Sequence, residues 1–218
     1  MKKISGIVIV ALLFILVACG ESEKAKEVSM ESKKNAVVEA IMNRRSIRAY
    51  KPEQIHQAQL DTIIQCGINA PSALNKQSWE VRVIQNADLL AAINNRFVEN
   101  AKGKTLQGSA AKAQEPGFSV FHGAPTLIIV ARDKSNSYSA VDCGLFAQNI
   151  LLSAQSMNIG TCVIGNMASI LNDPDSKEFL EAMQMPDSYE VVFGIAIGYK
   201  NESPEAKPRD IAKVQYVK

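Results

Sequence analysis

The spacing of hydrophobic positions predicts five helices. Apolar residues recur at intervals of three and four over 34–44 and again over 53–69, which places them on one side of each helix. Residues 140–157 are apolar around much of the helix circumference, so this helix should lie centrally in the fold. The five helices are predicted over residues 34–44, 53–69, 88–99, 140–157 and 175–183.

The remaining apolar runs predict strands. Residues 125–131 form a continuous apolar run, which is typical of a strand buried on both faces. Residues 214–217 are a further strand candidate with no obvious local partner, and residues 100–118 have no clear pattern. Because strands interleave with longer helices, the fold class is α/β or α+β. The four clear strands are predicted over 79–85, 125–131, 161–164 and 191–197.

The N-terminus has the pattern of an export signal. Two lysines precede an apolar run that is too short to span a bilayer comfortably, and the run ends at Leu16-Val17-Ala18-Cys19. This sequence resembles the bacterial lipobox, which predicts a signal peptide over 1–18, lipidation of Cys19 and a location on a membrane of the cell envelope, facing away from the cytoplasm. The alternatives are an ordinary cleaved signal or an uncleaved anchor. Residues 19–33 are polar and predict a flexible tether, followed by one domain over 34–218.

Charge and cysteine usage exclude several classes of function. The net charge is only +2 and the charges are mixed in sign, so no nucleic-acid partner is expected. Beyond Cys19, the cysteines lack CxxC spacing, which disfavours a disulfide framework or a zinc site, although one pair could still form. Two isolated histidines, His56 and His122, disfavour a histidine-based metal site or catalytic triad.

The first candidate site is a cluster of three arginines and a serine. Arg44, Arg45, Ser46 and Arg48 lie at the end of the first predicted helix. Guanidinium groups donate in a planar fork that matches phosphate oxygens, so the cluster predicts a phosphate site. The alternative is favourable positive charge at a helix C-terminus.

Two further clusters have a chemical interpretation. A polar loop between a helix and a strand could present amide groups to a planar heterocycle, and it contains Pro71, Ser72, Ala73, Asn75 and Gln77. Glycines around the predicted strand at 161–164 would let a flat ligand approach the backbone closely. Near the end of the chain, Lys207 and Arg209 could add to a phosphate site, or form only a basic tail.

Together these clusters resemble the nitroreductase family of FMN enzymes. No single motif is specific, but six of them occur in the family's order along residues 35–217. The matching motifs are Arg-Arg-Ser-x-Arg at 44–48, Ala-Pro-Ser-x-x-Asn-x-Gln-x-Trp at 70–79, Gly-Ala-Pro at 123–125, Gln-Asn-Ile-Leu-Leu at 148–152, Gly-Thr-Cys-x-Ile-Gly at 160–165, and Gly-Tyr at 198–199 with Lys-Pro-Arg at 207–209.

The resemblance implies an α+β fold, with a mixed or antiparallel central sheet flanked by helices, in an interlocked homodimer with FMN at the subunit interface. It implies that Ser72 and Asn75 reach the flavin of the other subunit, and that Ile164 and Gly165 lie beside its ring. The C-terminal segment would embrace the partner, and residues 100–118 would form a substrate lid. The phosphate and ribityl chain would be held by Arg44, Ser46, Arg48, Lys207 and Arg209.

The implied activity is ping-pong electron transfer from NAD(P)H through FMN to a small nitroaromatic or quinone acceptor. The chemistry would occur at flavin N5 with no catalytic side chain of the protein. Arg44 and Lys207 are candidates for stabilising negative charge that develops on the flavin. Ser78 departs from the family pattern, which often has proline there. Other flavin chemistry, such as reductive dehalogenation or flavin fragmentation, and a non-catalytic flavin-binding lipoprotein remain alternatives.

Overall fold

A computed structural model describes residues 35–218 of the chain. The predicted signal peptide, Cys19 and the tether lie outside these residues. Residues up to Glu39 belong to a separate unit, and residues 40–218 form the compact domain. No helix in the described part of the chain is long and apolar enough to cross a membrane.

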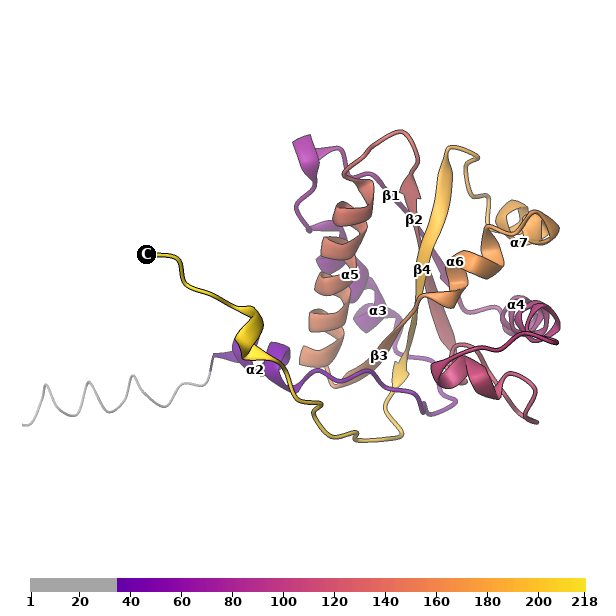
Figure 1. Ribbon diagram of the computed structural model, residues 1–218, viewed down its shortest axis with the longest axis horizontal. Helices are drawn as coiled ribbons and strands as arrows, with labels where there is room; N and C mark the ends of the chain where they lie inside the picture. The colour runs from indigo at the N-terminus through magenta and orange to yellow at the C-terminus, as the bar shows by residue number, and fades with distance from the viewer. Residues whose placement is uncertain (1–34) are drawn as a thin grey trace, which may run out of the picture. The chain divides into compact units, whose positions relative to one another are not determined.

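A four-stranded sheet in the order β1-β2-β4-β3 forms the centre of the domain (Figure 1). Every neighbouring pair is antiparallel, which confirms the α+β class. Strand β2 lies inside the sheet, and its residues 127–131 are fully buried, as its continuous apolar run predicts. The strands are β1 (Trp79–Ile84), β2 (Thr126–Asp133), β3 (Ile159–Ile164) and β4 (Tyr189–Tyr199).

Helices cover both faces of the sheet and divide the core into two parts (Figure 1). Helices α3 and α5 pack together on one face, while α6 packs on β4 at the other face, beside α4 and α7. All five predicted helices are present, with shifted ends. The helices are α2 (Ala36–Asn43), α3 (Gln57–Ile68), α4 (Ala87–Asn100), α5 (Ser139–Ser156), α6 (Asn166–Leu171) and α7 (Lys177–Ala182).

Helix α5 is central, but only one of its faces is buried. Phe146 and Ile150 are completely buried, whereas Val141 and Leu145 are exposed, as is Tyr138 just before the helix. A Cβ atom at Gly67 of α3 would lie 2.6 Å from Ile150 Cδ1 and 2.8 Å from Phe146 Cε2, so a glycine is needed where these helices meet. Helix α5 therefore contributes to the core on one side and presents an apolar surface on the other.

Two segments differ from what their patterns predict. Residues 214–217 do not form a strand; a short 3-10 turn, Ile211–Lys213, precedes them and Val217 is 96 % exposed. A strand needs a neighbour for its backbone groups, and the described chain offers none there. Residues 101–118, which had no clear pattern, pack beside α4, where the rings of Phe97 and Phe118 stack at 5.8 Å.

Candidate functional site

The chain brings two distant basic clusters into one pocket of about 120 Å³, here named the basic pocket. Pro204 and Glu205 also line it, and no sequence motif indicates either residue. The predicted phosphate-binding groups are therefore neighbours, although about 160 residues separate them along the chain. The predicted residues that line the basic pocket are Arg44, Arg45, Ser46, Arg48, Lys207 and Arg209.

The edge of the sheet holds the 44–48 segment in place. Ile47 is 2 % exposed, and its N–H donates to the carbonyl of Thr161 at 2.9 Å. Ser46 forms an isolated parallel bridge with the same residue of β3. The Tyr50 hydroxyl donates to the Ile47 carbonyl at 2.7 Å. One buried apolar side chain thus fixes the segment, while its polar neighbours line the pocket.

The basic pocket carries an excess of positive charge. Within residues 35–218, the ion pairs shorter than 4 Å all involve other side chains, so no described carboxylate neutralises the five cations at that distance. Glu202 accepts a hydrogen bond from the backbone N–H of Arg48, not from its guanidinium. The pocket is therefore suited to a dianionic group such as phosphate.

Arg45 has a second role besides lining the pocket. Its Nη1 donates to the carbonyl of Met42 at 2.7 Å and to that of Arg44 at 2.9 Å. These carbonyls lie at the C-terminal end of α2, where orphan acceptors are normally satisfied by such contacts. The helix-end interpretation therefore holds for Arg45, while the phosphate-site interpretation of the cluster stays a prediction.

The two glycines around β3 serve different purposes. A Cβ atom at Gly160 would lie 3.0 Å from Ile47 Cγ1, so this glycine lets the 44–48 segment approach β3 and is not needed for a ligand. A Cβ atom at Gly165 would meet no protein atom within 4 Å. Ile164 lies three residues beyond Thr161, about 10 Å along the strand. The backbone at Gly165 is therefore open to a ligand, at the end of β3 that lies about 10 Å from Thr161 and the attached 44–48 segment.

The 71–77 loop is shaped by its own backbone. Its centre is a 3-10 turn, Ala73–Asn75, and Leu74, Asn75 and Gln77 all have positive φ angles. The Ser72 hydroxyl accepts a hydrogen bond from the Gln77 N–H at 2.9 Å. The loop therefore has a defined conformation, in which Asn75 and Gln77 are exposed.

Asp142, which the sequence analysis missed, anchors this loop. Its Oδ1 accepts from the N–H of Ala73 at 3.0 Å, while its buried Oδ2 has no hydrogen-bond partner in the described structure. The only signal in the sequence was a single acidic residue in the first turn of an apolar helix. A carboxylate there is favoured by the helix dipole.

The 71–77 loop lies near one end of α5, and the chain segment that follows α2 and contains 44–48 lies near the other end (Figure 1). The loop is tied to Asp142 in the first turn of α5. Gln155, in its last turn, accepts from Lys200, which bridges to Tyr50 beside the 44–48 segment. These two turns are about 20 Å apart at 1.5 Å per residue. One chain therefore does not bring Ser72 and Asn75 to its own basic pocket.

The sequence model of the nitroreductase family matches residues 41–199. The chain belongs to the nitroreductase family. It is similar to the NADPH-flavin oxidoreductase of Vibrio harveyi, with 31% identity over 80% of this chain and 70% of that one. It is also similar to the 4-nitrobenzoate reductase of Pseudomonas putida, with 27% identity over 79% of this chain and 91% of that one.

Solved structures agree with the family and the fold. The fold is similar to that of a nitroreductase with bound FMN from Desulfitobacterium hafniense DCB-2, with a TM-score of 0.78 and 28% sequence identity. The match covers 85% of this chain and 100% of that chain. The likeness confirms the nitroreductase-like fold. The resemblance that the six sequence motifs indicate is thereby confirmed as well.

The cysteines of this nitroreductase domain are reduced and mostly shielded. Cys66, Cys143 and Cys162 are free, and only Cys66 is partly exposed. Burial raises the pKa of the Cys143 thiol to about 12. Burial also raises the pKa of Cys162, against the opposing effect of Arg48 nearby. Both buried thiols therefore stay protonated and unreactive near neutral pH.

Proposed function

We propose that this chain is an FMN-dependent oxidoreductase that passes electrons from NAD(P)H to a small acceptor, such as a nitroaromatic compound or a quinone. The observation that carries the proposal is the basic pocket, whose five cations outnumber its single lining carboxylate, Glu205, with open backbone at Gly165 just beyond the end of β3. Family membership, the flavin oxidoreductases among the relatives and the FMN-bound structural neighbour support it.

The residues present fit FMN. A phosphate group suits the basic pocket, where Arg44, Arg48, Lys207 and Arg209 supply positive charge and Ser46 supplies a hydroxyl. An aromatic ring needs a backbone that it can approach, and the vacant side of Gly165 offers one. The distance of about 10 Å along β3 matches a ligand with a phosphate at one end and a ring at the other.

When bound, FMN supplies the redox chemistry by accepting two electrons from a donor and passing them to an acceptor. The protein's part is to bind and orient. The cations of the basic pocket hold the phosphate and fix the position of the ring. The positive charges of Arg44 and Lys207 would stabilise the negative charge that develops on the flavin when it is reduced. The buried side chain of Ile164 fixes the strand end that precedes Gly165.

The activity test uses purified full-length protein. We expect it to be yellow, to lose its absorbance near 450 nm on anaerobic addition of NADH or NADPH, and to recover it with 4-nitrobenzoate or a quinone. Stopped-flow absorbance would measure both half-reactions. A protein saturated with FMN that neither donor reduces, or that no acceptor reoxidises, would instead support a flavin-binding lipoprotein without turnover.

We further propose an interlocked homodimer in which the 71–77 loop of one subunit reaches the flavin of the other. This arrangement would resolve the separation of about 20 Å between that loop and the basic pocket of the same chain. Support comes from apolar side chains on the open face of α5 and just before it, where Val141 is 61 % and Tyr138 is 62 % exposed. The exposed 214–217 tail fits the same arrangement.

Light scattering after size exclusion tests the homodimer. The natural chain should have the mass of two copies, and Leu145→Glu, on the same face of α5, should shift the equilibrium toward one copy. A buried charge without a partner is costly, so the shift is expected to be large. A monomeric natural protein that retains tightly bound FMN would contradict the shared site.

The export signal leads to a proposal about location. We propose that Cys19 is lipidated and anchors the enzyme on a membrane of the cell envelope. Acyl chains contribute about 0.8 kcal/mol per buried CH₂, so several chains would hold the protein firmly. Labelled palmitate should be incorporated into the natural chain and not into Cys19→Ser. Because nicotinamide cofactors are cytosolic, a membrane quinol or another flavoprotein is then a candidate for the physiological donor.

A further inference from the structure

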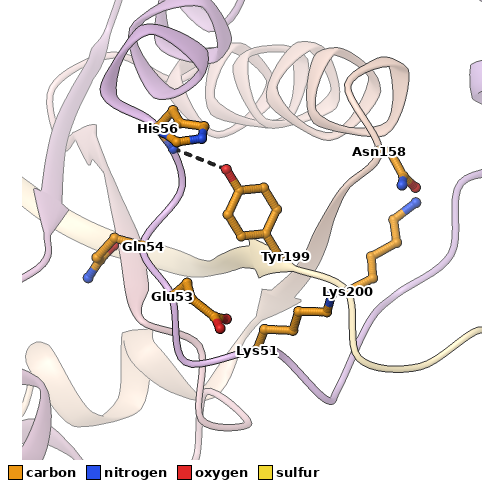
Figure 2. Close-up of a pocket in the computed structure, with 7 residues that line it drawn as sticks. All are labelled: Lys51, Glu53, Gln54, His56, Asn158, Tyr199 and Lys200. Carbon is orange, nitrogen blue, oxygen red and sulfur yellow. Dashed lines mark hydrogen bonds between the residues drawn. The ribbon is translucent and has the colours of Figure 1, made fainter.

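A second hollow, of about 480 Å³, is lined by residues that follow the 44–48 segment (Figure 2). It shares no lining residue with the basic pocket, and it is named here the Lys200 hollow. It lies beside the N-terminal end of β3, whereas Gly165 lies beyond the other end. Besides Gln54, its lining residues are Lys51, Glu53, His56, Asn158, Tyr199 and Lys200.

One wall of the hollow is fixed by the side chain of Gln54. Its amide nitrogen donates to the carbonyl of Pro125 at 2.7 Å. Its amide oxygen accepts from the Thr126 hydroxyl at 2.5 Å and from the Gln85 amide at 2.9 Å. All these partners lie outside the 51–56 segment. The wall is therefore held by the sheet and does not depend on a ligand for its shape.

Tyr199 holds the opposite side of the same segment. Its hydroxyl accepts from the backbone N–H of His56 at 3.3 Å (Figure 2). The hydroxyl also donates to Gln59 Oε1 at 3.0 Å, and the Tyr199 carbonyl accepts from the Lys51 N–H at 2.9 Å. The rings of His56 and Tyr199 meet edge to face at 6.4 Å. The rings of His56 and Tyr199 therefore give the hollow a partly apolar wall beside Lys51 and Lys200.

Lys200 carries a positive charge that the protein leaves uncompensated. Its ammonium donates to the neutral amide oxygen of Gln155 at 2.9 Å, and burial lowers its pKa. No carboxylate in residues 35–218 pairs with Lys200 or Lys51 within 4 Å, although Glu53 lines the same hollow. A partly desolvated ammonium without a counter-ion favours an incoming anion.

The stem of Lys200 has little freedom to withdraw. A Cβ atom at Gly160 would lie 3.0 Å from Lys200 Cγ, so the stem lies against the backbone of β3. In Figure 2 its ammonium points toward Asn158, and the Lys51 side chain extends toward Lys200. The hollow thus has donors at two places along one side, Lys200 with the Asn158 amide at one and Lys51 near the backbone end of Lys200 at the other.

From this geometry we propose that the Lys200 hollow is a second anion site, which binds a small organic carboxylate or phosphate monoester. The anionic oxygens contact Lys200 and Lys51, and the carbon skeleton lies against Tyr199 and His56. The site is separate from the basic pocket that takes the cofactor phosphate under the proposed function. Tyr50 bridges to Lys200, so binding at the two sites is expected to be coupled reciprocally.

Isothermal titration calorimetry on the FMN-saturated full chain tests the site, with benzoate as the carboxylate probe and glycerol 3-phosphate as the phosphate probe. We expect saturable binding of at least one probe, with one site per chain and no release of FMN. Lys200→Gln should weaken it about tenfold or more, because a charge-assisted contact is lost. Lys51→Gln, at an exposed residue, should weaken it severalfold, and Lys177→Gln on α7 should leave it unchanged.

Three results would overturn the proposal: no saturable binding of either probe to the FMN-saturated chain, binding that is unchanged in both lysine variants, or binding in which the probe displaces FMN one for one. The last would place the anion in the basic pocket. Failure of the proposed function has a different signature, namely a chain that does not retain FMN or does not exchange electrons. Titration of that chain with both probes would still report on the Lys200 hollow.

Discussion

Replacing both Arg44 and Arg48 with alanine is expected to weaken FMN binding by about 10²- to 10⁴-fold, because each change removes a charge-assisted hydrogen bond worth about 1.5–3 kcal/mol. Both side chains line the basic pocket, and the Arg48 guanidinium makes only one long contact, of 3.4 Å, with a protein carbonyl. The double variant should therefore fold normally. Quenching of FMN fluorescence on titration with protein would give both dissociation constants.

Two further variants separate phosphate binding from other effects of charge. Arg45→Ala removes hydrogen bonds to carbonyls at the end of α2, so it should destabilise that helix end and weaken FMN binding less than the double variant does. Lys177→Gln removes an exposed charge that is paired only with Glu181, and it should change nothing measurable. An Arg44/Arg48 variant that binds FMN within twofold of the natural protein would exclude the basic pocket as the phosphate site.

Phe146→Ala is expected to lower the free energy of unfolding by about 3–5 kcal/mol, a large share of the total stability of a typical domain. The Phe146 ring is completely buried and lies 5.5 Å from the ring of Trp79, between centroids. It also fills the space that Gly67 leaves between α3 and α5. Urea denaturation followed by circular dichroism, at a fixed FMN concentration because ligand binding adds to stability, would measure the loss.

Val83→Ala is the matched control for this core variant. Val83 lies in the edge strand β1 and is 40 % exposed, so its truncation should cost less than about 1 kcal/mol. Equal losses for the two variants would contradict the assignment of Phe146 to the core between the helices and the sheet. A loss below 1 kcal/mol for Phe146→Ala would do the same.

Most secondary structure could be predicted because long apolar periodicities are local properties of the chain. Helix α6 (Asn166–Leu171) was missed because six residues carry too little pattern and too little intrinsic helical stability. Packing stabilises it instead. Met167 is fully buried, and its Cγ would lie 2.6 Å from a Cβ atom at Gly194, so the missing side chain of β4 makes room for the helix.

The sequence by itself determined the kinds of chemical groups, a mixed helix-and-strand fold and the family resemblance, which implied the α+β class, because these depend on composition, periodicity and motif order. The tertiary structure decided which groups meet. Ile47 is buried against β3, so the 44–48 segment shares a pocket with Lys207 and Arg209. It does not share one with the 71–77 loop, because helix α5 separates them by about 20 Å. Proximity across a sheet is set by strand order and packing, which no local pattern records.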